Sequence, residues 1–331
     1  MAIITLDFNR FRSTDASQRQ EFCKELCETL SVYGFAKIRN TTLSNDLIDQ
    51  IFKHTRSFFA LPNEIKAKAK HPEAPNPHRG WSAVGQERVW KISGFEQNKE
   101  RTDSYNEFRE SFDQGASNDT LFPNKWVDEH DLPGFRTFME AFYQSCDELH
   151  AHLLDAISIG LNLPPTLLPS KHQHNTSELR LVHYPPIPCN ALKSNMRIGE
   201  HSDFGTLTLL LQDSVGGLQV EDQRNRGTFI PVEPEDGYEV VINIGDCLQR
   251  WTNKRLCSAN HRVMLPEGMD VESDVMLEDR FSVAYFGKPD RGVLVDSLEE
   301  CVDVEGGEEV VYRDGVTALE YMQMKLTRTY G

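Results

Sequence analysis

Three side chains in the second half of the chain have the types and spacing of a metal site. His201 and Asp203 are separated by one residue, and His261 follows several predicted strands later. On a strand, residues 201 and 203 would point to the same side, because alternate side chains share a face. Two histidines and one carboxylate on one face of an octahedron leave positions open for a cosubstrate and O₂, as in non-haem Fe(II) sites. We therefore predict that these three residues bind Fe(II); the alternative for a histidine is core packing.

A second pair of residues could bind a carboxylate. Arg280 and Ser282 are also two apart on a predicted strand, so their side chains would point to one side. A guanidinium pairs bidentately with a carboxylate, and a hydroxyl adds one donor. In a pocket the pair would hold the distal carboxylate of 2-oxoglutarate, whose keto-acid end chelates iron. The alternative is a surface arginine, but the position of the pair downstream of His261 favours the carboxylate site.

The elements that must position these residues change type along the chain. Apolar residues recur at helical spacing over 17–32, from 44 to near Pro62, and over 133–163, while 71–130 is expected to be irregular. From residue 178 onward, short β-rich runs alternate with turn residues, and a last helix is expected over 316–328. The expected strands are Leu179–Tyr184, Thr206–Gln212, Gly217–Val220, Phe229–Val232, Tyr238–Ile244, Cys247–Trp251, His261–Leu265 and Phe281–Phe286.

This pattern predicts an all-β core with flanking helices. The specific expectation is a double-stranded β-helix, or jelly roll, braced by N-terminal and central α-helices. Because no linker rich in Gly, Ser or Pro separates the parts, we expect a single domain over 1–331. It would comprise a mainly helical part (1–175), a jelly-roll catalytic core (176–300) and a C-terminal helix (301–331).

Composition excludes several classes of partner. The chain has 51 acidic and 35 basic residues, and its net charge of −16 would repel nucleic acid and anionic membranes. We find no signal peptide and no apolar run long enough to span a bilayer. The seven cysteines form no C-x-x-C pair, which is typical of reduced thiols in an intracellular protein. We therefore expect a cytoplasmic protein.

The whole chain resembles the Fe(II)/2-oxoglutarate-dependent dioxygenases of the isopenicillin N synthase-like superfamily. The likeness is strongest to fungal thymine 7-hydroxylase-like and secondary-metabolism oxygenases. The motifs that carry it are Tyr33-Gly34-Phe35, Arg79-Gly80-Trp81-Ser82, Glu110-Ser111-Phe112-Asp113, Leu179-Arg180-Leu181-Val182-His183-Tyr184-Pro185, Gly199-Glu200-His201-Ser202-Asp203-Phe204-Gly205, Gly216-Gly217-Leu218-Gln219-Val220, Asn243-Ile244-Gly245-Asp246, Asn260-His261-Arg262-Val263 and Arg280-Phe281-Ser282-Val283-Ala284-Tyr285-Phe286.

The resemblance implies roles for further residues. It implies iron ligands at the three positions above, and cosubstrate contacts from Arg280, Ser282 and the Tyr184 hydroxyl. Residues facing substrate would include Phe204, Phe286, Arg180 and Trp81. The alternative is core packing for Phe204 and Phe286, and anchoring of the loop for Trp81. The thymine enzymes have a hydroxylated aromatic after the metal-binding Asp, and Phe204 lacks that donor.

The resemblance also implies the reaction. Fe(II), 2-oxoglutarate and O₂ would oxidise a small organic molecule by hydroxylation, desaturation or ring rearrangement, in fungal secondary or nucleobase metabolism, with ascorbate as the reductant in vitro. The protein would be a monomer or homodimer. Two alternatives remain at this point. One is a same-fold Fe(II) oxidase that does not use 2-oxoglutarate, as isopenicillin N synthase does not, and the other is a non-catalytic cupin-like binding protein.

Overall fold

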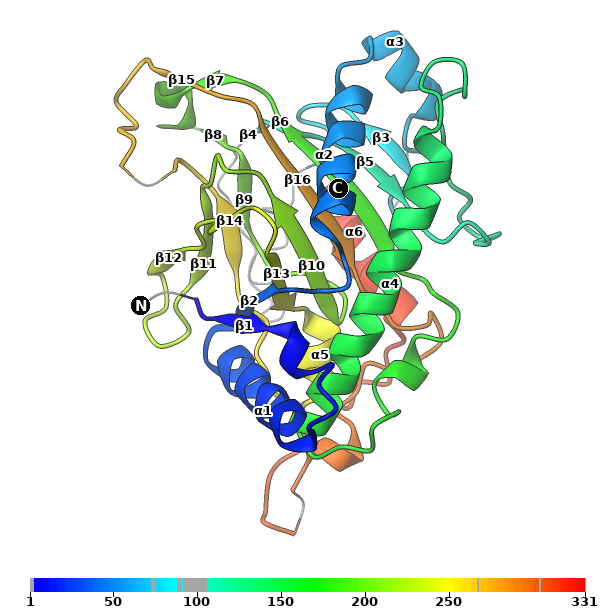
Figure 1. Ribbon diagram of the computed structural model, residues 1–331, viewed down its shortest axis with the longest axis vertical. Helices are drawn as coiled ribbons and strands as arrows, with labels where there is room; N and C mark the ends of the chain where they lie inside the picture. Colours follow the sequence, from blue (N-terminus) through cyan, green and yellow to red (C-terminus); the bar gives the residue numbers. More distant parts are fainter. Residues whose placement is uncertain are drawn as a thin grey trace.

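Two β-sheets face each other at the centre of the molecule, with helices packed around them (Figure 1). The structure is a computed structural model that describes residues 3–72, 76–87, 91, 106–193, 195–266, 268–303 and 305–330. The two facing sheets confirm the predicted jelly roll.

The larger sheet has eight strands in the order β1-β2-β13-β10-β16-β6-β5-β3. Its strands are β1 (Thr5–Asp7), β2 (Phe35–Arg39), β3 (Gly80–Ser82), β5 (Glu110–Gln114), β6 (Glu178–Tyr184), β10 (Leu207–Gln212), β13 (Val240–Ile244) and β16 (Arg280–Phe286). All neighbours are antiparallel except β1 and β2. The part of the chain before residue 175 therefore supplies strands to the core as well as helices.

The smaller sheet has four strands in the order β12-β11-β14-β9. Its strands are β9 (Ile198–His201), β11 (Leu218–Glu221), β12 (Phe229–Pro231) and β14 (His261–Val263). Two short pairs lie beside the sheets: β15 (Met276–Leu277) with β7 (Ile187–Pro188), and β4 (Asn106–Glu107) with β8 (Asn195–Met196).

Alternate side chains of the strands pack into two separate apolar cores. Leu207, Leu209 and Leu211 of β10 pack into a core with the helices. Val182 and Tyr184 of β6 instead belong to a smaller apolar cluster that includes residues of the smaller sheet. Because successive side chains of a strand point to opposite faces, one face of the larger sheet is covered by helices and the other faces the smaller sheet.

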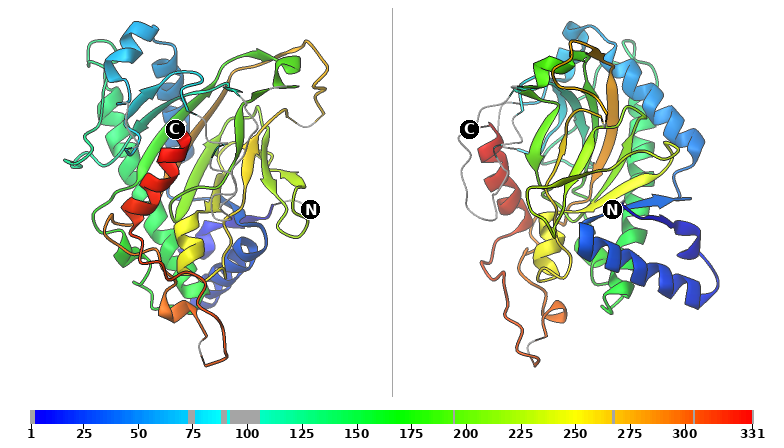
Figure 2. Two further views of the ribbon diagram at one scale, coloured as in Figure 1. Left: turned by 180° about the vertical axis from the view of Figure 1, so that it is seen from behind. Right: turned by 90° about the vertical axis from the view of Figure 1, so that its left-hand side faces the viewer.

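The helices are α1 (Ala16–Tyr33), α2 (Asn45–Phe59), α3 (Asn63–Lys66), α4 (Phe135–Gly160), α5 (Asp246–Trp251) and α6 (Ala318–Tyr330). Short 3-10 turns occupy Phe8–Arg10, Ala67–Ala69, Pro169–Lys171, Cys189–Lys193 and Glu299–Cys301. The predicted helix starts and stops are confirmed: Ser44 caps α2 through Leu47 N, and Gly34 ends α1 with φ 68°. Helix α6 lies on the opposite side of the molecule from α2 (Figures 1 and 2).

Two expectations are wrong. Residues 247–251 form helix α5 rather than a strand, since a short apolar run has no period that separates the two forms. The segment 71–130 is not wholly irregular, because β3 and β5 join the larger sheet. Strand β5 escaped prediction because its buried residues include Glu110 and Asp113, which break the apolar alternation. Parts of that segment, at 73–75, 88–90 and 92–105, lie outside the described residues.

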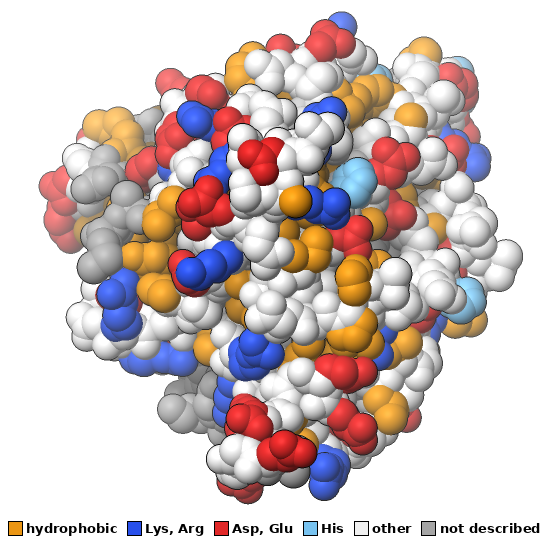
Figure 3. Space-filling model, turned by 60° about the horizontal axis from the view of Figure 1, so that its bottom comes forward, with side chains coloured by type: hydrophobic (Ala, Val, Ile, Leu, Met, Phe, Trp, Pro, Cys, Tyr) orange, Lys and Arg blue, Asp and Glu red, His pale blue; other side chains and the backbone are white. Residues whose placement is uncertain are grey.

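The face drawn in Figure 3 carries both acidic and basic side chains. All seven cysteines are free thiols, as predicted. Within the described ranges, no helix has the length and apolar character needed to cross a bilayer.

The buried His150 and the half-buried His172 make stability depend on pH. Burial lowers the pKa of His172 from 6.5 to about 4, and burial also holds the pKa of His150 well below its ordinary value. Between pH 6.5 and 4 the unfolded chain therefore binds protons that the folded chain does not. The free energy of unfolding is therefore highest above pH 6.5 and falls as the pH is lowered. The loss at pH 5 is about 2 kcal/mol for His172 alone.

Urea unfolding at pH 7.5 and pH 5.0 measures this loss. His172→Gln should flatten the dependence of the unfolding free energy on pH, because one titrating group is removed. His174→Gln is the matched control, since the His174 side chain is 79% exposed. An equal pH slope in the His172 variant and the parent would contradict the assignment.

Candidate active site

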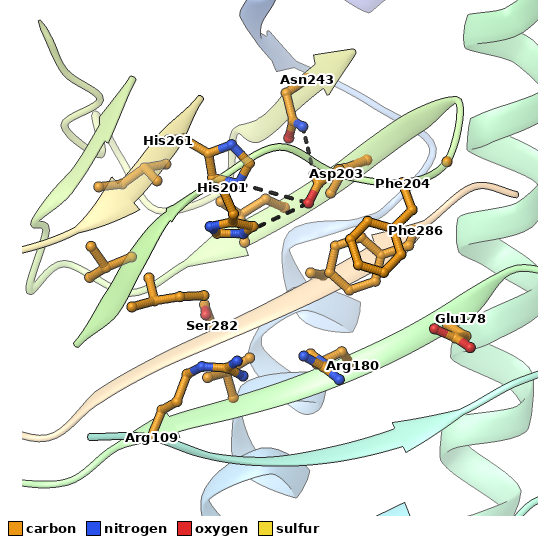
Figure 4. Close-up of a pocket in the computed structure, with 18 of the residues that line it drawn as sticks. Arg109, Glu178, Arg180, His201, Asp203, Phe204, Asn243, His261, Ser282 and Phe286 are labelled. Carbon is orange, nitrogen blue, oxygen red and sulfur yellow. Dashed lines mark hydrogen bonds and ion pairs between the residues drawn. The ribbon is translucent and has the colours of Figure 1, made fainter. Parts of the chain in front are cut away.

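His201, Asp203 and His261 converge between the two sheets (Figure 4). Their candidate ligand atoms all lie within 4.8 Å of one another, and all three residues are buried. Asp203 Oδ1 is 4.0 Å from His201 Nε2 and 3.8 Å from His261 Nε2. The two histidines come from neighbouring strands of the smaller sheet and are direct partners in the register of β9 and β14.

Hydrogen bonds fix which imidazole nitrogen faces this centre. His201 Nδ1 lies 2.8 Å from the Gly199 carbonyl oxygen, and His261 Nδ1 lies 3.2 Å from that of Ala259. A carbonyl only accepts, so each Nδ1 carries the proton and each Nε2 presents a lone pair to the centre. Burial and the neighbouring His261 lower the pKa of His201 to about 3, which keeps its imidazole in the neutral form that a metal needs.

Asp203 is positioned by the larger sheet. Strand β9 ends at His201, so Asp203 lies in the loop after the strand rather than on the strand, where the sequence pattern had suggested it. Its Oδ2 accepts hydrogen bonds of 2.6 Å from both Asn243 Nδ2 and Thr208 Oγ1, which leaves Oδ1 for the centre. Burial alone would raise the pKa of Asp203, but the two imidazoles and these two donors hold that pKa below its ordinary value.

Arg280 provides the buried cation that the sequence predicts. Its Nε donates to the Gly216 carbonyl at 2.8 Å, and Nη2 donates to Gln212 Oε1 at 3.2 Å. Its Nη1 is buried and has no hydrogen-bond partner among the described residues. An unpaired buried donor is costly, so this nitrogen fits the carboxylate of a cosubstrate. Ser282 lies on the same face of β16, and Tyr184 is the direct partner of Arg280 on β6.

Comparisons with known proteins agree with this geometry. Residues 175–289 match the model of the 2OG-Fe(II) oxygenase superfamily, and residues 3–129 match the model for the N-terminal region of non-haem dioxygenases in morphine synthesis. The chain is 83% identical over 331 residues to 2-oxoglutarate-dependent dioxygenase htyE of Aspergillus rugulosus, covering 100% of both proteins. It is 48% identical, again over 100% of both, to proline hydroxylase buaE of Petromyces alliaceus.

A solved structure shows the same likeness. The full-length thymine 7-hydroxylase of Neurospora crassa, in complex with alpha-KG, aligns with a TM-score of 0.85 and 30% identity, over 98% of this chain and 95% of that chain. The chain belongs to the 2-oxoglutarate/Fe(II) oxygenase superfamily. It is a 2-oxoglutarate-dependent dioxygenase that uses iron to oxidise a small organic molecule. The cosubstrate-independent oxidase and the cupin-like binding protein are thereby set aside.

The pocket of the dioxygenase lies on the inner face of the larger sheet. Alternate residues of β6 and β16 line it, as expected for side chains that share one face of a strand. These residues are Glu178, Arg180, Val182 and Tyr184 of β6, and Arg280, Ser282, Ala284 and Phe286 of β16. The smaller sheet closes the other side with Ile198, Leu218 and Val263. The metal group and the Arg280 site therefore open into one cavity.

The four predicted substrate residues have different environments. Phe204 and Phe286 line the pocket (Figure 4). Arg180 lines it too, but its guanidinium is held by Asp113 at 2.6 Å and by Glu87 at 2.9 Å. Trp81 is not among the described lining residues; its indole Nε1 donates to Glu110 at 2.7 Å. The structure therefore places Trp81 as an anchor for β3 rather than at the substrate mouth.

Sequence reasoning missed several charged residues of the pocket. Arg109, Glu178, Lys288 and His78 line it, although they belong to different segments of the chain. Lys288 Nζ lies 2.5 Å from Glu178 Oε2. Glu178 stands two residues before Arg180 on β6, so the strand period could have identified it. No local pattern marks Arg109, because the segment before β5 has no regular alternation.

Proposed function

We propose that this dioxygenase hydroxylates a free amino acid of the proline class. The observation that carries the proposal is a cationic nitrogen that is open to the pocket. Arg109 donates from Nε to Glu107 at 3.2 Å and from Nη2 to Glu87 at 3.0 Å, whereas Nη1 makes no hydrogen bond with the described part of the chain. A substrate carboxylate would supply the missing acceptor.

Two further features of the pocket support an amino acid. Glu178 lies in the lining, and its carboxylate can accept a hydrogen bond from an ammonium group in addition to the bonds from Lys288 and Arg79. Phe204 and Phe286 offer an apolar wall for an aliphatic ring and exclude water from it. The relative named as a proline hydroxylase supports the same substrate class.

The roles of the predicted site residues follow from their positions. His201, Asp203 and His261 would bind Fe(II), while Arg280, Ser282 and Tyr184 would bind 2-oxoglutarate. When bound to these residues, Fe(II) would supply the chemistry that couples oxidative decarboxylation of 2-oxoglutarate by O₂ to oxidation of the substrate. The chain itself would orient both imidazoles through their Nδ1 hydrogen bonds, anchor one oxygen of Asp203, and direct a C–H bond of the substrate towards the metal.

We also propose that the protein is a single domain over 1–331 that acts in the cytoplasm as a monomer or homodimer. Pairing of β2 with β13 joins the N-terminal part of the chain to the jelly-roll part in one sheet, which supports a single domain. The net charge of −16 disfavours nucleic acid and anionic membranes as partners.

Succinate release with a panel of compounds tests the substrate. L-Proline should stimulate succinate formation. The kcat/KM for L-prolinamide should be at least about tenfold lower than for L-proline, because L-prolinamide lacks the carboxylate that would pair with Arg109. Arg109→Met should raise the KM for L-proline by a similar factor and leave the 2-oxoglutarate-induced absorption band of the Fe(II) protein unchanged. Arg109→Lys, which keeps the charge, covers the case in which the methionine variant does not fold.

Arg136→Met is the control for loss of a cation, since Arg136 is an exposed residue of α4. Stimulation by thymine but not by L-proline would overturn the proposed substrate. Equal turnover of L-proline and L-prolinamide would remove Arg109 from the role assigned to it.

A further inference from the structure

A buried ion pair joins the C-terminal helix to the loop that carries Asp203. Lys325 of α6 has 0% exposed side chain, and Asp246, the first residue of α5, has 1%. Their ion pair also contacts Ser202, the residue between His201 and Asp203: Ser202 Oγ is 3.2 Å from both Lys325 Nζ and Asp246 Oδ2. Tyr321, one turn before Lys325 on α6, donates to the same carboxylate oxygen at 3.0 Å.

The backbone of α5 holds the same loop. Asp246 N donates to the Asp203 carbonyl, and Cys247 N donates to the Gly205 carbonyl, each at 2.9 Å. Cys247 Sγ lies 3.0 Å from the carbonyl oxygen of Phe204. Residues 202–205 are therefore fixed to the first turn of α5, and that turn is fixed to α6 by a buried charge.

Phe204 separates the active-site pocket from α6. One side of Phe204 lines the pocket, and the other side borders a small cavity lined by Ala318, Leu319 and Met322 of α6. Lys325 Nζ lies 4.7 Å from the centre of the Phe204 ring, which is within cation–π distance. Without this cation, the ring could move into the cavity beside α6.

The metal-binding carboxylate has an independent support. Asn243 and Thr208 of the larger sheet hold Asp203 Oδ2, and neither residue contacts α6 through a hydrogen bond found in the described chain. Loss of the Lys325 contact should therefore displace Phe204 more than the metal site. These two side chains are adjacent in sequence, but they are held by different elements.

We propose that Lys325 and Asp246 form a positioning pair through which the C-terminal helix sets the place of Phe204, and hence the substrate C–H bond that is presented to the metal. The pair is not needed to bind Fe(II) or 2-oxoglutarate. Its role is to couple consumption of 2-oxoglutarate to oxidation of the substrate.

The experiment compares Lys325→Met with the parent enzyme, using L-proline as substrate. The ratio of succinate to hydroxylated product should rise at least about threefold and kcat for product should fall about tenfold, because a misplaced C–H bond reacts poorly. The KM for 2-oxoglutarate should stay within about twofold and the Fe(II)–2-oxoglutarate absorption band should persist, since the cosubstrate site is untouched. Measurement of the hydroxylated product rests on the proposed substrate. The absorption band and the release of succinate in the absence of substrate do not depend on it.

Two additional variants keep the proposal falsifiable. Lys325→Met leaves Asp246 as an uncompensated buried charge, so Lys325→Met/Asp246→Asn provides a neutral pair if the single variant does not fold. Asp314→Asn is the matched control: it removes an ion pair of 2.6 Å between Arg250 of α5 and the segment before α6, and this pair does not contact residues 202–205. Only the Lys325 variants should uncouple consumption of 2-oxoglutarate from oxidation of the substrate.

A double-mutant cycle of Lys325→Met with Phe204→Leu tests whether Lys325 affects coupling through Phe204. If Lys325 acts through Phe204, the two substitutions together should uncouple no more than the stronger of the two alone. Additive effects would overturn that route. Parental coupling in folded Lys325 variants, or loss of the absorption band in proportion to turnover, would overturn the positioning role itself.

Discussion

Asp203→Ala should lower succinate release at least about 10³-fold, the scale of loss seen when a central catalytic group is removed. The reason is the donor set: Asp203 supplies the only carboxylate among the three residues that converge between the sheets within the described structure. Without it, only two imidazole ligands remain, and the divalent cation loses its one negatively charged protein ligand of the three. Anaerobic titration with Fe(II), read by the absorption band that forms with 2-oxoglutarate, measures the loss directly.

Asp203→Glu and Asp49→Ala are the controls for this prediction. Glutamate keeps the charge but moves the carboxylate away from Asn243 and Thr208, so partial Fe(II) binding with poor turnover is expected. Asp49 is an exposed acid on α2, and its replacement should have no effect. Retained turnover in Asp203→Ala would reject the metal site.

Arg280→Met should raise the KM for 2-oxoglutarate about 100-fold while Fe(II) binding persists, since a charge-assisted bidentate bond contributes about 3 kcal/mol. The evidence is the buried Nη1 that lacks a partner in the described chain. Titration of the Fe(II) protein with 2-oxoglutarate, followed by absorption, separates this effect from loss of metal.

A second buried guanidinium lies near Arg280. Arg197 is fully buried, and two of its guanidinium nitrogens also lack a partner among the described residues. Burial, followed by the charge of Arg280, lowers the pKa of Arg197, so the two guanidiniums are close enough to interact. Arg280→Lys should fall between the parent and the methionine variant, because it keeps the charge but loses the planar fork. An unchanged requirement for 2-oxoglutarate in Arg280→Met would contradict the assignment.

The sequence predicted the chemistry of the site from residue types, spacing and the family resemblance taken together. The H-x-D and R-x-S spacings alone are weak signals. The resemblance made them specific for His201, Asp203 and His261, and for Arg280 with Ser282, because a facial metal site and a carboxylate site each need particular side chains. It also determined most helices and strands, since apolar periodicity records which face of an element is buried. The helix of residues 246–251 was missed because a six-residue run has no readable period.

The tertiary structure was needed to identify the charged residues that line the pocket. Arg109, Glu178 and Lys288 come from separate segments, and no local pattern predicts that a fold will bring them into one pocket. It also showed that Arg180 is neutralised by Asp113 and Glu87, which a strand pattern cannot reveal. The contact of Lys325 with Phe204 likewise joins the last helix to the middle of the chain. Such pairings depend on the packing of distant elements, whereas the metal ligands are marked by their own chemistry.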